Sequence, residues 1–122
     1  MAERVRALRG AITVENDTRE QVIERTALLI KTMLERNGVE KRDLISIIFT
    51  ATDDIASEFP AAAAREIGIS DVPLLCAREL DVLDAVGLCI RVMMHLYTDK
   101  EPSALRHVYL EGAVPLRTDL PQ

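Results

Sequence analysis

The alternation of apolar and polar side chains is clearest over residues 88–97. The even positions of this run are all apolar, while the odd positions carry Cys89, Arg91, Met93, His95 and Tyr97. A period of two is typical of a β-strand, whose side chains point alternately to the two faces of a sheet. The pattern therefore predicts a strand with one dry face and one face available for chemistry.

Arg91 lies in the middle of this apolar run. A guanidinium keeps its proton at any ordinary pH and is costly to bury without an anionic partner. The residues alone leave two partners equally open, which are a carboxylate of the protein in a structural ion pair and a bound anionic ligand.

The first third of the chain predicts a strand followed by a long helix. Residues 5–14 form the strand, where Arg9 shares one face with Ala11 and Thr13, and Gly10 allows close approach of another backbone. Apolar positions at helical spacing predict a helix over residues 18–36 that ends at Gly38.

The start of that helix carries capping signals. Thr18 with Gln21, or Asp17 with Glu20, has the spacing of a capping box, in which side chains bond the first free amides of a helix.

The rest of the chain alternates short strands with one more helix. A nearly continuous apolar run over residues 45–51 predicts a central strand covered on both faces. A short helix should follow Pro60 over residues 61–67, and an edge strand should span residues 72–76, ending before residues 77–81. A loop over residues 98–103 leads to a final strand at residues 106–110.

These elements predict one α/β (α+β) domain over residues 1–122. Its mixed sheet should have about five strands, with the helices packed on one face. A chain of 122 residues with 48% hydrophobic residues suffices for one such core.

Charge and composition exclude several partners. The net charge is -5, and no basic cluster mixes with aromatic residues, so we do not expect a nucleic-acid partner. No run approaches the ~20 apolar residues of a membrane span, and the chain starts without a secretory apolar stretch, so we expect a cytoplasmic protein without membrane contact. Cys76 and Cys89 are too few for a disulfide framework, so reduced thiols are expected.

Arginines are the main candidates for binding. Arg9, Arg65, Arg91, Arg106 and Arg117 are spread along the chain, and one carboxylate, Glu79, closely follows Cys76. The planar guanidinium binds carboxylates through two bonds, so the set favours a ligand with two carboxylates, although the sequence does not show that the arginines converge. His95 and His107 are expected to be structural.

Several short segments, in this order and spacing, are similar to those of a known family. They are RGAITV at residues 9–14 with NDT at 16–18, FPA at 59–61 with Arg65-Glu66, VPLLC at 72–76 with Glu79, CIRVMM at 89–94, RHVYL at 106–110, and Leu116-Arg117 with Asp119-Leu120. The chain resembles the small monofunctional chorismate mutases of the trimeric α/β type, which are unrelated in fold to the all-helical chorismate mutases.

The resemblance implies a Claisen rearrangement of chorismate to prephenate, in the shikimate pathway to phenylalanine and tyrosine. This reaction is pericyclic and needs no nucleophile, proton shuttle, metal or other cofactor. The absence of a Ser/His/Asp set, zinc spacing and a phosphate loop agrees with that chemistry. Such a reaction needs a site that selects a compact conformer of a flexible dianion and stabilises the charge that develops.

The resemblance also implies the site residues. Arg91 would face the ether oxygen, Glu79 would accept a hydrogen bond from the ring hydroxyl with Cys76 nearby, and Arg9 would hold a carboxylate. The catalytic set is then Arg91, Glu79 and Arg9, and the substrate-binding set is Phe59, Arg65, Leu74, Leu75, Cys76, Tyr109, Leu116 and Arg117. No metal ligand is expected.

The family's assembly is a homotrimer, a pseudo-α/β barrel with sites between subunits. The segment from Phe59 to Arg65 and the strand leading to Cys76 can then be contributed by two different chains. Ala62 stands where some relatives have a lysine, which should affect capture of the dianion and not the chemistry.

Two other functions remain open at this point. A trimeric hydrolase of imines or enamines has a similar fold and binds carboxylates through an interfacial arginine, but should need fewer charges. A non-catalytic module that binds carboxylates would bind the ligand without turnover.

Overall fold

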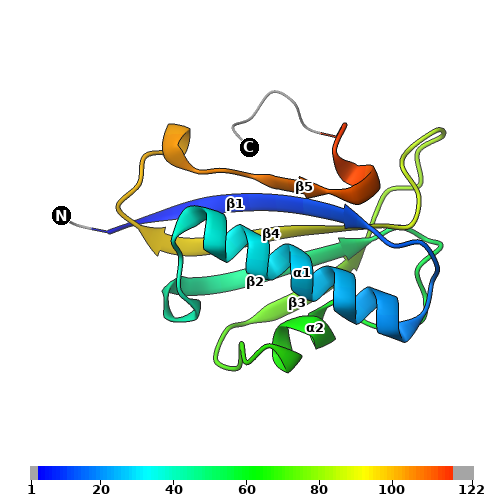
Figure 1. Cartoon of the computed structure of the whole chain (residues 1–122), viewed down its shortest axis with the longest axis horizontal. Helices are drawn as coiled ribbons and strands as arrows, with labels where there is room; N and C mark the ends of the chain where they lie inside the picture. The colour runs from blue at the N-terminus through cyan, green and yellow to red at the C-terminus, as the bar shows by residue number, and fades with distance from the viewer. Residues whose placement is uncertain (1–2, 117–122) are drawn as a thin grey trace.

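Arg91 lies on the central strand of a five-stranded mixed sheet with the order β3-β2-β4-β1-β5 (Figure 1). The computed structural model describes residues 3–116. Its strands are β1 (Arg4–Thr13), β2 (Leu44–Ala51), β3 (Leu74–Arg78), β4 (Cys89–Thr98) and β5 (Val108–Leu110). β4 runs antiparallel to both β1 and β2, while β3 and β5 extend the sheet by parallel pairing. The predicted number of strands is confirmed.

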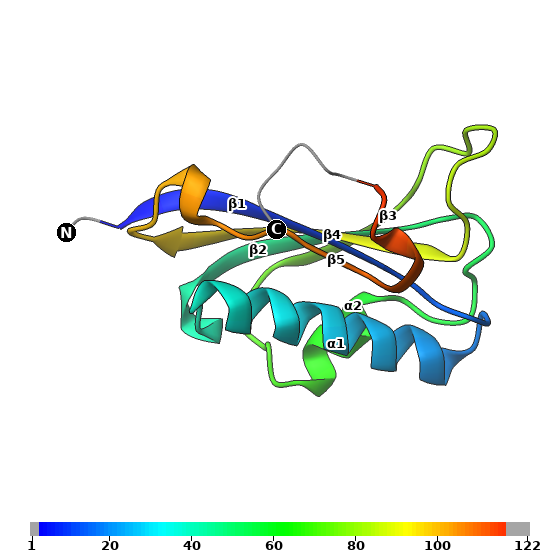
Figure 2. The ribbon, with the colours of Figure 1, turned by 45° about the horizontal axis from the view of Figure 1, so that its top comes forward.

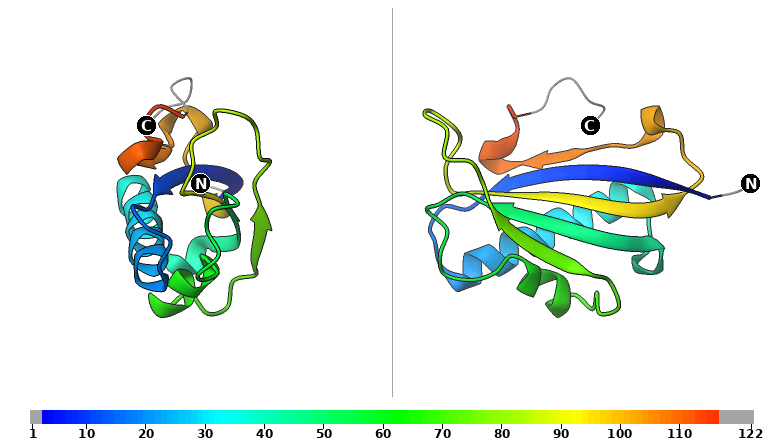
Figure 3. Two further views of the ribbon diagram at one scale, coloured as in Figure 1. Left: turned by 90° about the vertical axis from the view of Figure 1, so that its right-hand side faces the viewer. Right: turned by 180° about the vertical axis from the view of Figure 1, so that it is seen from behind.

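Within residues 3–116, two α-helices cover one face of this sheet, and the other face is left open (Figures 2 and 3). They are α1 (Arg19–Asn37) and α2 (Ala61–Glu66). In the same described residues, the short 3₁₀ turn η1 (Lys41–Asp43) precedes β2, η2 (Pro102–Ala104) follows β4, and η3 (Glu111–Ala113) follows β5. The expected packing of helices on one face is confirmed.

The period of two in β4 separates the dry face from the open one. Ile90, Val92, Met94 and Leu96 are at most 1% exposed beneath the helices, while the alternate side chains of β4 point to the open face. Burying apolar side chains against a helix layer stabilises by about 1.5–3 kcal/mol for each large residue. This register fixes the face on which Arg91 emerges.

Gly10 allows α1 to lie close to β1. A Cβ atom at this position would lie 2.6 Å from Sδ of Met33 and 3.1 Å from the carbonyl oxygen of Val108. The close approach expected from the sequence is therefore present.

The start of α1 uses only half of the predicted capping box. Thr18 is the N-cap, and its hydroxyl accepts a bond from the Gln21 amide at 3.2 Å. The Gln21 side chain instead accepts bonds from the amides of Glu15 and Asn16, which fixes the loop after β1. Gly38 ends the helix in the left-handed conformation, as predicted.

Two strands, β3 and β5, have ends that lie two residues from the predicted ones. β3 includes Ala77 and Arg78, because parallel pairing with β2 continues as far as Ala51 opposite Arg78. β5 begins only at Val108, because the amide of Arg106 donates to the Asn37 side chain at 2.7 Å instead of to a neighbouring strand.

β2 was predicted to be covered on both faces, but within the described residues only its helix-facing side is fully buried. Ile47 and Phe49 are buried beneath the helices, but Ile48 and Thr50 on the opposite face are only half-buried. Within residues 3–116, this second face of β2 is therefore only partly covered.

Candidate active site

Arg91 and Glu79 meet on the open face of the sheet. Arg91 lies opposite Ala11 of β1 and Thr50 of β2. Arg9, Thr50, Glu79 and Arg91 line a cavity of about 260 Å³, whose floor is formed by β1, β2 and β4. The two arginines and the carboxylate expected to act together therefore do lie together.

Glu79 is held at the end of β3 from both its backbone and its side chain. Its amide donates to the carbonyl of Ala51 at 3.0 Å, which extends the sheet by one bond beyond the strand. The Thr50 hydroxyl donates to Oε2 of its carboxylate. The carboxylate is thus fixed over β2, on the same face as Arg91.

Arg91 and Glu79 form an ion pair that leaves a donor unused. Nε of Arg91 lies 3.4 Å from Oε2 of Glu79, but the geometry does not make this contact a hydrogen bond. This buried Nε has no hydrogen-bond partner among the residues that the structure describes. A buried donor without a partner is costly, so this N–H is suited to a ligand.

Tyr109 lies on the same face and carries a second unused group. It pairs with Ala11 across β1 and β5, and its buried hydroxyl has no hydrogen-bond partner within residues 3–116. Together with Ala11, Cys89 and Ala113 it forms a small apolar cluster, against which Leu116 packs. The segment after β5 therefore approaches the Arg91 face.

Cys89 belongs to this cluster as a neutral thiol. Burial raises the pKa of Cys89, although the charge of Arg91 acts in the opposite direction. The thiol remains protonated at neutral pH. This agrees with the expectation that Cys89 is a buried structural thiol.

Arg9 is fixed through its backbone by His107. The amide of Arg9 donates to Nδ1 of His107 at 3.0 Å, just before β5 begins. The imidazole thus continues the pairing of β1 where the neighbouring strand has not started. This contact agrees with the structural role expected for His107.

The first residues of β4 are held by the loop that follows β2. The Thr52 hydroxyl accepts a bond from the Cys89 amide at 3.0 Å, and the Asp54 carboxylate accepts the Leu88 amide at 2.9 Å. Leu88 has a positive φ of 47°, a conformation that these bonds help to maintain. These bonds fix the beginning of β4 and, with it, the position of Arg91 two residues further along the strand.

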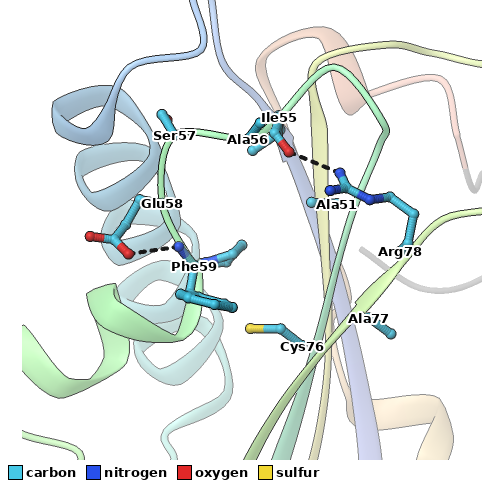
Figure 4. Close-up of a pocket in the computed structure, with 10 residues that line it drawn as sticks. Ala51, Ile55, Ala56, Ser57, Glu58, Phe59, Cys76, Ala77 and Arg78 are labelled. Atoms are coloured by element: carbon cyan, nitrogen blue, oxygen red, sulfur yellow. Dashed lines mark hydrogen bonds between the residues drawn. The ribbon is translucent and has the colours of Figure 1, made fainter.

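A second cavity lies on the helix side of the sheet, at its β3 edge. It has a volume of about 480 Å³, and Figure 4 shows the Cys76 thiol and the Phe59 ring on its walls. Arg78 also lines it, donating to the carbonyl of Ile55 at 2.8 Å and to that of Thr52 at 2.7 Å. The Phe59 side chain is 67% exposed, so this wall is open in one chain.

Within residues 3–116, no group of three His, Cys, Asp or Glu side chains could hold a metal ion. In the same part of the chain, no helix is long and apolar enough to cross a membrane.

Comparisons with known proteins decide the family. Residues 5–120 match the model of the type I chorismate mutases. This chain belongs to that family. It is 50% identical to "Chorismate mutase AroH" of Thermus thermophilus over 117 residues, which are 95% of this chain and 96% of that protein. It is 43% identical to "Chorismate mutase AroH" of Bacillus subtilis (strain 168), covering 95% of this chain and 92% of that protein.

A solved structure agrees with this assignment. The chain resembles a chorismate mutase from Clostridium thermocellum with a TM-score of 0.90 and 48% identity, covering 91% of this chain and 99% of that one. The protein is a chorismate mutase, an isomerase whose substrate is chorismate and whose reaction serves aromatic amino acid biosynthesis. Neither the imine hydrolase nor the non-catalytic module is favoured.

The chorismate mutase chain does not gather all of the predicted substrate-binding residues in one place. Cys76 pairs with Phe49 and therefore lies on the helix side of β3, with Leu74. Leu75 lies on the open side, opposite Ile48, and is 61% exposed. Cys76 and Glu79 of one chain lie on opposite faces of the sheet, so the predicted contact of Cys76 beside Glu79 stays a prediction that a single chain does not test.

A single chain brings two of the predicted substrate-binding residues to one cavity. Phe59 and Cys76 line one cavity of the same chain, so the segment at Phe59 and the strand leading to Cys76 need not come from two different chains. Arg65 is exposed in the last turn of α2 and lines neither this cavity nor the one at Arg91. Arg117 lies outside the described residues.

Two residues at these cavities were missed in the sequence, Thr50 and Arg78. Thr50 lies within the apolar run at residues 45–51, which predicts a strand covered on both faces and no site residue. The cross-strand register could have identified Thr50. It pairs with Arg91 of β4, and paired residues of neighbouring strands point to the same face of the sheet. Arg78 lies 3.6 Å from Asp53 in an ion pair, and its guanidinium also fixes the loop beside Phe59.

Asp17 provides a pH-dependent anchor for that loop. Its carboxylate accepts bonds from the amides of Ala56 and Ser57 at 2.9 and 3.1 Å. The Ser57 hydroxyl, followed by the Ala56 amide, lowers the pKa of Asp17 below its ordinary value of 3.8. A lowered folded-state pKa stabilises the fold above the unfolded pKa, and this stabilisation is lost as the pH falls through the folded value.

We therefore expect Asp17→Asn to lower the thermal unfolding midpoint at pH 7 by more than at pH 3. The difference between wild type and variant should be constant above about pH 5 and shrink below about pH 4. Asp71→Asn, at an exposed carboxylate before β3, serves as the control. An Asp17→Asn penalty that is equal at both pH values would contradict the assignment.

Proposed function

We propose that the rearrangement of chorismate to prephenate takes place over β4, with Arg91 and Glu79 as its catalytic residues. The observation that supports this most is the buried Nε of Arg91, which lies beside a carboxylate and has no hydrogen-bond partner in the described part of the chain. Such a donor can meet an oxygen that becomes negative during the reaction.

The chemistry follows from the two groups. As the ether C–O bond breaks and the new C–C bond forms, electron density grows on the ether oxygen, and Arg91 donates to it. Glu79 accepts a hydrogen bond from the ring hydroxyl and offsets the positive character of the ring. No proton is transferred in the step, so the site has to position and stabilise only.

The remaining groups of this face hold the substrate in its compact form. Arg9 is the partner for one carboxylate, since it lines the same cavity and its backbone is fixed. The unused hydroxyl of Tyr109 is the contact for the enolpyruvyl side. Arg65, Leu116 and Arg117 are proposed to close the pocket around the other carboxylate.

We further propose that a neighbouring chain completes the pocket in a homotrimer with three sites, a pseudo-α/β barrel. The cavity at Arg91 has about 260 Å³, below the about 300–1,000 Å³ of most ligand pockets. Its open face also exposes apolar side chains such as Leu75, which monomers rarely leave in a patch. The Phe59 and Cys76 cavity of another chain would supply the missing wall, with Leu74 and Leu75 at its β3 edge.

The compartment that we propose is the cytoplasm. The two cysteines of the chain are both free, which agrees with a reducing environment.

Arg91→Ala should lower kcat for chorismate at least about 10²- to 10³-fold, because a preorganised donor to the developing charge is lost. Glu79→Gln should also lower kcat while the protein stays folded. Turnover is followed by NMR as prephenate formation, and circular dichroism checks the fold. Wild-type turnover in Arg91→Ala would rule out its assigned role, and an unfolded Glu79→Gln variant would instead indicate a structural ion pair.

Leu75→Asp should dissociate the trimer, because it places a charge on the open face of β3. Leu28→Asp is the matched control, since Leu28 is also exposed (45%) but lies on α1. Sedimentation equilibrium should give the mass of one chain for Leu75→Asp and of three chains for wild type and Leu28→Asp. The proposed interface is wrong if Leu75→Asp remains a trimer.

A further inference from the structure

The two catalytic groups have opposite charges and lie within ion-pair distance, which creates a problem for catalysis. Nε of Arg91 lies 3.4 Å from Oε2 of Glu79, and both side chains are less than a third exposed. In a partly dry site, attraction between such charges is much stronger than in water. A full pairing would direct the N–H of Arg91 at Glu79 and away from the substrate.

Thr50 binds the oxygen on which that pairing depends. It lies opposite Arg91 in the antiparallel pairing of β2 and β4, so both side chains emerge on the open face. Its hydroxyl donates to Oε2 of Glu79, the same oxygen that faces Nε of Arg91. In this arrangement Nε of Arg91 makes no hydrogen bond with any of residues 3–116.

Thr50 is well placed to set the rotamer of Glu79. The backbone of Glu79 is fixed by the bond to Ala51, but the chain leaves the sheet directly afterwards, and Leu80 is 85% exposed. The position of the carboxylate is therefore decided by contacts of its own oxygens, with Thr50 and with Arg91. β2 is a regular strand at this point, so the hydroxyl of Thr50 is rigidly placed.

We propose that Thr50 is a positioning residue for the mutase reaction, which keeps Oε2 of Glu79 engaged so that Nε of Arg91 stays free for the ether oxygen. Oε1 of Glu79 is then the oxygen that accepts the ring hydroxyl. This inference rests on the proposed roles of Arg91 and Glu79.

Thr50→Val and Thr50→Ser test the role of the hydroxyl. Valine keeps the branched shape and the strand preference but cannot donate, whereas serine keeps the donor. We expect Thr50→Val to lower kcat about 10- to 100-fold with KM changed less than about threefold, since hydrogen bonds to charged groups have effects of this order. Thr50→Ser should recover most of the loss.

A double-mutant cycle separates positioning from a general structural effect. In a Glu79→Gln background, Thr50→Val should lower kcat less than about twofold further, because the carboxylate that Thr50 holds is already gone. An equal loss in both backgrounds would overturn the inference, as would unchanged kcat in Thr50→Val. If Thr50→Val does not fold, Thr50→Ala is measured in the same cycle.

Measurements on the wild-type protein separate a failure of the proposed function from a failure of the proposed role of Thr50. No prephenate from wild type would contradict the proposed function itself. Wild-type turnover that depends on Arg91 and Glu79 but not on the Thr50 hydroxyl would overturn only the inference about Thr50.

Discussion

The register of β4 is the constraint on which the rest of the structure depends. A period of two buries Ile90 and Val92 beneath the helices and brings Arg91 out on the opposite face, next to Thr50 of β2. A shift by one residue would bury the guanidinium under α1 and expose the apolar series. The energy of core burial and the geometry of the site are therefore fixed by the same pairing, and the bonds from Thr52 and Asp54 to the start of β4 maintain it.

The chain places the two parts of the proposed site on opposite sides of one sheet. The open face carries charge, with Arg9, Glu79 and Arg91 around a small cavity. The β3 edge carries an apolar wall at Phe59 and Cys76, on the helix side. A sheet separates these parts within one chain, so we propose that they meet only between chains. This also gives a role to the uncovered apolar face, which costs free energy in a monomer.

Much of the fold follows from the sequence because periodicity, caps and stop signals are local. The strand at Arg91, the helix ending at Gly38 and the placement of helices on one face were all predicted. The ends of β3 and β5 were not, because pairing of Ala51 with Arg78 and the bond from Arg106 to Asn37 are long-range. The site could not be predicted fully for the same reason, which is that strand pairing is long-range. The parallel pairing of Cys76 with Phe49 places Cys76 on the face away from Glu79, and the antiparallel pairing of Thr50 with Arg91 places Thr50 in the site.

The most direct test of this account is to mix two variants that are each inactive, Arg91→Ala and Phe59→Asp. Each variant damages a different part of the site, so a hybrid trimer should contain intact sites where the undamaged faces of the two chains meet. After joint refolding at equal concentrations, random assembly predicts recovery of about one quarter of wild-type turnover. A mixture that stays as inactive as the separate variants would show that one chain supplies the whole site and would contradict the account.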